Sequence, residues 1–134
     1  FDDTHSLIYG LRTVDYNKRV YVTEGPIDSL FLPNSIAVAG SDFSKLKSIV
    51  PVEQAVIVFD NERRNPEIIK KMSKLIDDDF EICIWPKTIG QKDINDMVLS
   101  GLSPNVIIDT INKNSFSGLK AKMGLSDWSK VSGK

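Results

Sequence analysis

The chain has 134 residues, of which 41% are hydrophobic and 26% are charged, and its formal net charge is −1. This length suits one compact domain with its own hydrophobic core, and the composition is that of an ordinary globular protein. The net charge neither demands nor forbids a nucleic-acid partner: the globally basic composition usual in domains that bind duplexes is absent, so the local distribution of charge decides. With one cysteine and one histidine, the chain has too few ligands for a disulfide or a zinc site, so any metal must be held by oxygen ligands, which favours magnesium, manganese or calcium.

The sequence contains no apolar run long enough to span a membrane, and no signal peptide opens it. We therefore expect a cytoplasmic protein without a membrane partner. Because the sequence begins at Phe1 rather than at a methionine, we also expect it to be a domain of a larger protein. The single cysteine, Cys83, lies in the apolar run 80–85 and is predicted to be buried and inert.

Apolar runs and turn signals predict strands that alternate with helices along the chain. Strands are expected at 6–9, 20–23, 36–39, 54–59 and 80–85, and helices at about 26–31, 43–49, 66–76, 94–100 and 104–111. After the strand 20–23, Gly25 permits a tight turn and Pro26 suits the first position of a helix.

The strands are apolar throughout rather than alternating, which predicts a parallel sheet covered on both faces. The expected fold class is α/β, a Rossmann-like arrangement with about four mainly parallel strands. We expect one domain over residues 1–112 with its core at 18–101, followed by a basic, mobile tail or linker over 113–134.

Acidic residues follow the predicted strands at three places: Glu24 with Asp28, Asp60 with Glu62, and Asp93 with Asp96. Because the carboxyl ends of parallel strands share one edge of a sheet, these groups can converge. Two carboxylates about 4 Å apart repel each other by about 4 kcal/mol at an effective dielectric constant of 20, and a hard divalent cation relieves that repulsion. The chemistry that such a site serves most readily is phosphoryl or nucleotidyl transfer.

Each acidic group also has a simpler interpretation. Asp28 can stabilise a helix N-terminus, Asp93 can cap the helix that follows it, and Asp60 can belong to an ordinary loop. Glu24 gains nothing obvious from its turn. The ordered set therefore indicates a site better than any single member does.

The segments Glu24-Gly-Pro-Ile-Asp28, Asp60-Asn-Glu62 and Lys92-Asp-Ile-Asn-Asp96 together resemble the TOPRIM domain over residues 18–101. That fold is shared by bacterial and phage primases, type IA and type II topoisomerases and several nucleases. The Lys-Asp-Ile-Asn-Asp segment is most similar to primases of bacteriophages and their fused primase-helicases. The resemblance implies a DNA primase that makes short RNA primers on a single-stranded DNA template from ribonucleoside triphosphates, with Mg²⁺ or, as a substitute, Mn²⁺.

The same resemblance implies roles for individual residues. Glu24 matches the catalytic acid or base, and Asp60, Glu62 and Asp93 match acidic positions that bind the metal. Aspartate is usual at the position of Glu62, and the longer side chain could shift the metal. Lys92 can reach a nucleotide phosphate. The residues expected to support the site without contacting substrate are Asp28, Asp96, Gly25 and Gly40.

Basic and aromatic side chains are further candidates for nucleic-acid contacts. Arg63 and Arg64 directly follow the acidic pair, and their guanidinium groups suit phosphates, although a solvated lead-in to a helix explains them equally well. The lysines of the tail can aid single-strand binding or merely keep the tail soluble. Trp85 fits a core position better, and Trp128 is a candidate for stacking on a base.

Two other functions stay open at this stage. A TOPRIM nuclease would use the same metals with water as the nucleophile, and a non-catalytic TOPRIM module would bind nucleic acid or a protein partner. For the primase, the resemblance also implies an N-terminal zinc-binding module, a replicative helicase in cis or in trans and, for a phage-encoded protein, the cytoplasm of the bacterial host.

Overall fold

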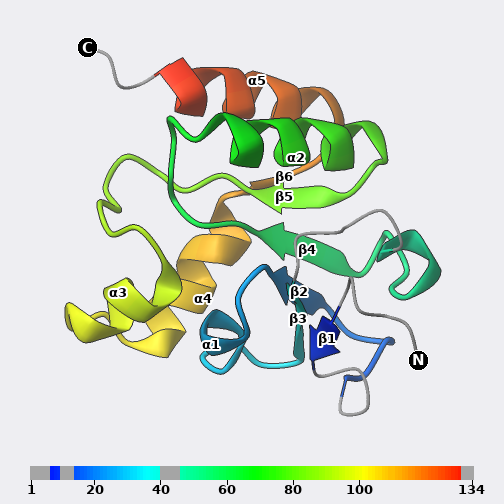
Figure 1. Ribbon diagram of the computed structural model, residues 1–134, viewed down its shortest axis with the longest axis horizontal. Coiled ribbons are helices and arrows are strands. Elements are labelled where there is room, and N and C mark those ends of the chain that lie inside the picture. Colours follow the sequence, from blue (N-terminus) through cyan, green and yellow to red (C-terminus); the bar gives the residue numbers. More distant parts are fainter. Residues whose placement is uncertain (1–6, 10–13, 40–45, 131–134) are drawn as a thin grey trace.

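The computed structural model describes residues 7–9, 14–39 and 46–130, which form one six-stranded sheet with helices on both faces (Figure 1). The strands are β1 (Leu7–Tyr9), β2 (Val20–Thr23), β3 (Ser35–Ala39), β4 (Ala55–Val58), β5 (Glu81–Cys83) and β6 (Ser115–Phe116). Their order across the sheet is β1-β3-β2-β4-β5-β6. Strands β2, β3, β4 and β5 are parallel, whereas β1 and β6 pair antiparallel at the two edges. The prediction of an α/β, Rossmann-like fold with mainly parallel strands is therefore confirmed.

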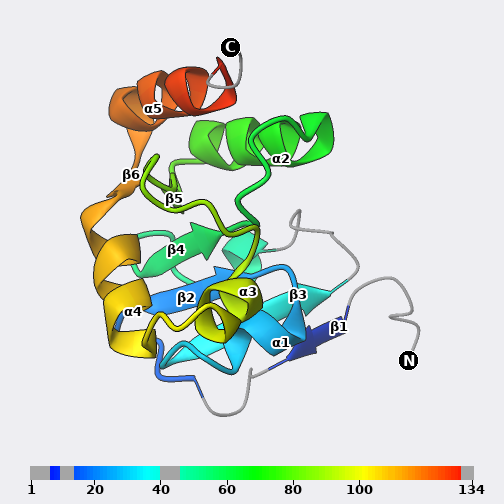
Figure 2. The same cartoon turned by 90° about the vertical axis from the view of Figure 1, so that its left-hand side faces the viewer.

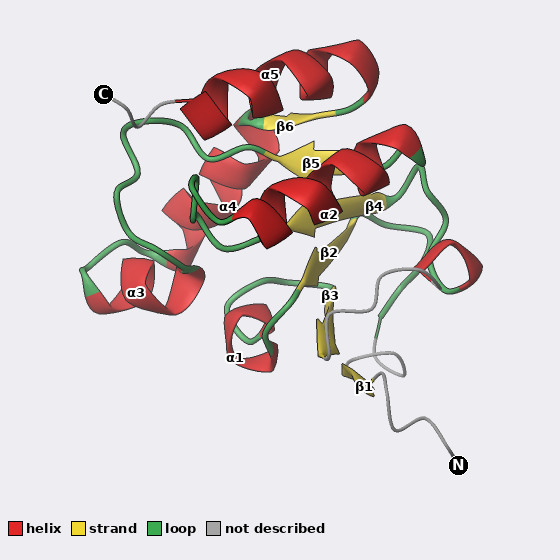
Figure 3. Ribbon diagram, turned by 45° about the horizontal axis from the view of Figure 1, so that its top comes forward, coloured by secondary structure: helices red, strands yellow, loops and turns green. Residues whose placement is uncertain are grey.

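The helices divide between the two faces of the sheet. They are α1 (Pro26–Ser29), α2 (Pro66–Asp77), α3 (Ile94–Leu99), α4 (Pro104–Lys113) and α5 (Gly118–Lys130), together with the 3-10 helix η2 (Leu46–Ser48). Ile57 of β4 packs in one core cluster with residues of α2 and α5, while the neighbouring Val56 packs in a second cluster with residues of α3 and α4. Helices α2 and α5 lie side by side in Figures 2 and 3. Within the described ranges, no helix is both long and apolar enough to cross a membrane.

Polar side chains cap the N-terminal ends of three helices, among them Asp93, for which the sequence allows this role. Asn65 caps α2, Asp93 caps α3 and Ser103 caps α4, each by accepting a hydrogen bond from a backbone N–H group of the first turn. A cap of this kind contributes about 1 kcal/mol to helix stability. Gly101, with a φ of 105°, follows α3 in a conformation that other residues rarely adopt.

The expected mobile tail is wrong for residues 115–130. This segment forms the edge strand β6 and the helix α5, and Ala121, Leu125 and Trp128 are buried in the core beside α2. The three residues are spaced four and then three apart, so they lie on one face of the helix, and the lysines occupy the other faces. In the sequence Met123, Leu125 and Trp128 hint at a small amphipathic segment, but the polar composition of the tail outweighs this hint.

Two further details differ from the predicted elements. The helix expected over 43–49 is represented only by η2, because residues 40–45, including Gly40, lie outside the described residues. Gly25 has a φ of −104° and a ψ of 136°, which any residue can adopt. The turn before α1 therefore does not need the conformational freedom of glycine, contrary to the expectation.

Candidate functional site

The edge formed by the carboxyl ends of β2 and β4 is the centre of the candidate site. These strands are neighbours with Thr23 opposite Val58, so Glu24 and Asp60 follow them at adjacent places on that edge. Strand β2 leads through α1 to β3 on one side, and β4 leads through α2 to β5 on the other side. Such a topological switch point is where open α/β sheets form their ligand-binding crevices.

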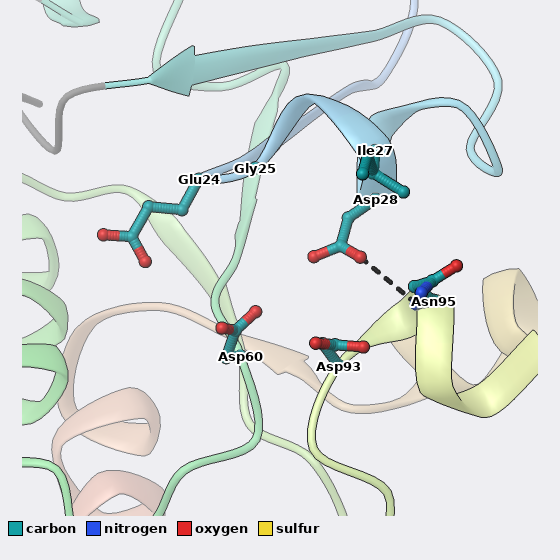
Figure 4. A pocket seen from close by; sticks show the side chains of 7 residues that line it. All are labelled: Glu24, Gly25, Ile27, Asp28, Asp60, Asp93 and Asn95. Atoms are coloured by element: carbon teal, nitrogen blue, oxygen red, sulfur yellow. Dashed lines mark hydrogen bonds between the residues drawn. The ribbon is translucent and has the colours of Figure 1, made fainter.

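Four carboxylates line a pocket of about 400 Å³ at this edge (Figure 4). The lining residues are Glu24, Gly25, Ile27, Asp28, Asp60, Asp93 and Asn95. Glu24 and Asp28 lie in the segment from β2 to α1, Asp60 follows β4 and Asp93 caps α3, so the fold gathers them from three separate segments. The Asn95 backbone N–H donates to Asp28 Oδ1 at 3.2 Å, which ties α1 to the start of α3.

Burial and mutual repulsion of the carboxylates raise pKa values in the pocket. Burial, followed by the negative charges of Asp28, Asp93, Glu24 and Glu62, raises the pKa of Asp60 to about 7. Burial also raises the pKa of Asp28, assisted by the charge of Asp93 and opposed by hydrogen bonds from the Asn95 N–H and with Asp60. At neutral pH, a proton or cation that binds in the pocket and reduces its negative charge therefore stabilises it.

The donor set fits a hard divalent cation that keeps much of its own water. All side-chain donors of the pocket are oxygens apart from the amide nitrogen of Asn95, and burial together with the neighbouring carboxylates disfavours the charged form of Asp60. Among the described residues, no three Asp, Glu, His or Cys side chains already converge closely enough to hold an ion by themselves. Magnesium usually binds through one or two carboxylates, waters and substrate phosphates, which suits carboxylates spread around a pocket better than it suits a closed cage.

Lys71 of α2 is a residue of the site that the sequence did not reveal. Its Nζ forms an ion pair with Glu24 Oε2 at 2.8 Å, and only 24% of the Lys71 side chain and 21% of the Glu24 side chain are exposed. In Figure 4 the Glu24 carboxylate points away from Asp60. Lys71 precedes the buried Met72 at the border of the apolar face of α2, but nothing in the spacing indicates that this border meets the end of β2. The hydrogen bond from Asn95 to Asp28 cannot be predicted from the sequence either, because Asn95 donates it with its backbone N–H group.

The structure does not bring Glu62 into the pocket with Asp60 and Asp93. Glu62 Oε1 accepts a hydrogen bond from Asn65 Nδ2 at 2.8 Å, and its Oε2 lies 3.1 Å from Lys92 Nζ. The Asn65 hydrogen bond, with help from Lys92, lowers the pKa of Glu62. Glu62 therefore lies beside the pocket, next to the residue that caps α2.

The basic residues expected to contact phosphate also lie outside the pocket lining. Arg63 Nη2 donates to the backbone carbonyls of Trp85 at 3.3 Å and Pro86 at 3.1 Å, and its guanidinium carbon lies 5.7 Å from the ring centroid of Trp128. Arg64 and Lys92 are exposed. Their role toward phosphates stays a prediction.

Three other predicted residues also lie away from the pocket. Asp96 is exposed in the first turn of α3. Trp85 is 2% exposed and Trp128 is 3% exposed. The core position of Trp85 is confirmed, and Trp128 is too deeply buried to stack on a base.

The comparison with known proteins links this region to a primase. The chain is 42% identical over 127 residues to a DNA primase of Enterobacteria phage T4, and the match covers 92% of this chain and 36% of that protein. The chain thus spans about a third of the length of the primase it matches. No family model matches the sequence. The identity supports a primase-related region.

Proposed function

We propose that this chain is the TOPRIM-type catalytic region of a phage DNA primase that synthesises RNA primers by Mg²⁺-dependent nucleotidyl transfer. The observation that carries the proposal is the acidic pocket at the switch point between β2 and β4, lined by Glu24, Asp28, Asp60 and Asp93. The 42% identity to a phage DNA primase supports the same reaction class. The substrates would be ribonucleoside triphosphates and a single-stranded DNA template.

In this proposal Asp60 and Asp93 hold Mg²⁺, and Mn²⁺ can substitute. The cation supplies charge neutralisation at the phosphates during the displacement. Asp28 is placed to act with them, because it lines the same pocket and raises the pKa of Asp60. Asp28 would therefore act directly in the pocket rather than only support it. Glu62 would act from outside the pocket, through its ion pair with Lys92 and its hydrogen bond with Asn65.

Glu24 is the proposed general base. The 3′-hydroxyl of the growing primer attacks the α-phosphorus of the incoming nucleotide, a new O–P bond forms, and the bond to the departing pyrophosphate breaks. The hydroxyl proton passes to the Glu24 carboxylate. Lys71, which pairs with Glu24 at 2.8 Å, orients this carboxylate before substrate arrives.

The basic residues around the pocket are the proposed contacts for nucleic acid and nucleotide. Exposed Lys92 and Arg64 are the proposed contacts for triphosphate or template phosphates. Arg63 is the weaker candidate, since it is less exposed than these two residues and its guanidinium donates to two backbone carbonyls. A replicative helicase in cis or in trans and the cytoplasm of the bacterial host belong to the same proposal.

The test is template-directed primer synthesis by the full-length protein carrying Glu24→Gln. Loss of a general base costs typically about 10²–10⁴ in rate, so activity should fall by at least about a hundredfold while the circular dichroism spectrum is unchanged. Glu67→Gln, at an exposed position in the first turn of α2, is the matched control and should retain activity. Wild-type rates in the Glu24 variant would overturn the proposal.

The acidic pocket alone also fits a nuclease, because water can replace the 3′-hydroxyl as the nucleophile at the same metal. Incubation with end-labelled single strands and Mg²⁺ or Mn²⁺ separates the two reactions. Extension that depends on ribonucleoside triphosphates supports the primase, whereas shortening without nucleotides supports the nuclease. Binding of DNA without binding of Mg²⁺, measured by calorimetry, would instead indicate a non-catalytic module.

A further inference from the structure

Asn61, between Asp60 and Glu62, donates three hydrogen bonds to the loop that joins β5 to α3. Its backbone N–H donates to Lys92 O at 2.6 Å. Its side-chain Nδ2 donates to Ile89 O at 3.0 Å and to Gln91 O at 3.1 Å. All three acceptors lie in the last residues before Asp93.

The remaining polar atom of the Asn61 side chain reaches the C-terminal helix. Asn61 Oδ1 accepts a hydrogen bond from Trp128 Nε1 at 3.2 Å, and Trp128 is 3% exposed on the inner face of α5. Arg63 lies over the same ring and donates to the carbonyls of Trp85 and Pro86, at the start of the same loop. The segment 61–63 therefore touches both the loop and α5.

We propose that Asn61 is a positioning residue that sets the separation of Asp60 and Asp93 in the acidic pocket and couples it to α5 through Trp128. Asp60 is the covalent neighbour of Asn61, and Asp93 is the covalent neighbour of Lys92, whose carbonyl accepts from Asn61. Each carboxylate is thus one residue away from a hydrogen-bonded pair. Displacement of the loop would move Asp93 relative to Asp60.

The chemistry of the contacts explains why an amide is required here. The side chain must donate two hydrogen bonds to carbonyls and accept one from an indole, which asparagine does with its amide group. An aspartate could accept from Trp128 but would present oxygen to the carbonyls of Ile89 and Gln91. This inference rests on the proposed function where it concerns metal binding by Asp60 and Asp93. The hydrogen bonds by which Asn61 restrains the loop do not depend on that function.

The first experiment measures how far the Asn61 side chain restrains the loop, in the absence of metal and substrate. Asn61→Ala removes the side-chain bonds and keeps the backbone bond to Lys92. Hydrogen–deuterium exchange in the presence of a chelator should then be at least about tenfold faster at the amides of Ile89 and Asn95, which are hydrogen-bonded on either side of the contact. Exchange in β2 and β4 should be unchanged.

The matched control is Asn112→Ala. Asn112 Oδ1 accepts a hydrogen bond from Tyr21 Oη at 2.8 Å, far along the chain from the loop. Its loss should leave exchange at Ile89 and Asn95 as in the wild type. Equal acceleration in both variants, or uniform acceleration throughout the sheet in the Asn61 variant, would show general destabilisation and overturn the positioning role.

The second experiment measures the consequence for the pocket. Asn61→Ala should weaken Mg²⁺ binding by about tenfold or more in calorimetry, while Asn112→Ala should leave it within about twofold. In a Trp85→Phe background Trp128 is the one remaining tryptophan of the sequence, and its emission should change on addition of Mg²⁺ and a nucleotide. That change should disappear when Asn61→Ala is added.

The outcomes separate this inference from the proposed function. If the wild type binds no Mg²⁺, the proposed function fails, and the exchange data still decide whether Asn61 holds the loop. If the wild type binds Mg²⁺ and Asn61→Ala binds it equally well, the positioning role is refuted. Emission of Trp128 that does not respond to bound Mg²⁺ and nucleotide refutes the coupling to α5.

Discussion

Replacement of Asp60 by asparagine should make the metal-free protein more stable. In the folded protein the pKa of Asp60 is raised from 3.8 to about 7, mainly by burial and then by the neighbouring carboxylates. A shift of about three units corresponds to at most about 4 kcal/mol at 1.36 kcal/mol per unit. Because the side chain is only half-buried, solvent screening reduces this to roughly 1–2 kcal/mol. Asparagine removes the charge with almost no change in shape.

The pH dependence of this gain has a definite sign. Between pH 4 and pH 7 the folded wild type holds more protons than the unfolded chain, so its stability falls as the pH rises through this window. The advantage of Asp60→Asn should therefore be near zero below pH 4 and complete above pH 7. Urea unfolding at pH 4 and pH 8 in the presence of a chelator measures both limits.

Addition of Mg²⁺ should reverse the order of the two proteins. A ligand at about one hundred times its dissociation constant stabilises the folded state by about 2.7 kcal/mol, and this gain belongs to the wild type alone if Asp60 holds the ion. Asp127→Asn, at an exposed position on α5, is the control and should follow the wild type at each pH and Mg²⁺ concentration. A metal-free Asp60 variant that is no more stable than the wild type at pH 8 would refute the electrostatic reasoning.

Three further outcomes test other parts of the structure. Lys71→Met should lower the rate of primer synthesis about tenfold or more, because Glu24 loses its ion-pair partner at 2.8 Å. Lys70→Met, on the exposed side of α2, should leave the rate unchanged, and equal rates in both variants would contradict the role of the ion pair. Glu62→Gln should leave Mg²⁺ affinity within about twofold in calorimetry, since Glu62 does not line the pocket, and a loss of about tenfold or more would place it among the metal ligands. Leu125→Ala should cost about 2–4 kcal/mol in urea unfolding because the side chain is 7% exposed in the core, and a change below about 0.5 kcal/mol would mean that α5 is dispensable for the fold.

The sequence allows prediction of the sheet because its signals are local. The runs around Val22 and Ile57 are apolar without interruption, since a parallel strand covered on both faces has no polar side. The ends of these strands are marked by Glu24 and Asp60, so the edge that carries the pocket is readable as well. Topology then brings the two acids together without any further information.

The elements that sequence reasoning missed depend on contacts between distant segments. Strand β6 has two residues, too few for a pattern, and it exists because Phe116 pairs with Ile82 across the edge of the sheet. Helix α5 has a clear buried face, but its order depends on packing against α2 rather than on its own composition. The placement of Lys71 depends on how α2 is rotated over the sheet, which no spacing within α2 specifies, and that of Glu62 depends on its contacts with Asn65 and Lys92.

The fold must hold the acidic pocket together against its own charge. Two carboxylates about 5 Å apart repel by roughly 3 kcal/mol at an effective dielectric constant of 20, so without a cation their mutual repulsion opposes assembly of such a pocket. Separate parts of the structure oppose this: Lys71 pairs with Glu24, the Asn95 N–H binds Asp28, and Asn61 holds the loop before Asp93. These restraints come from α2, α3 and the segment after β4, so several elements together keep the carboxylates in place. Glu24 and Asp28 are four residues apart, whereas Asp60 and Asp93 each follow a further strand, so the pocket and its restraints form only when these segments come together in the sheet.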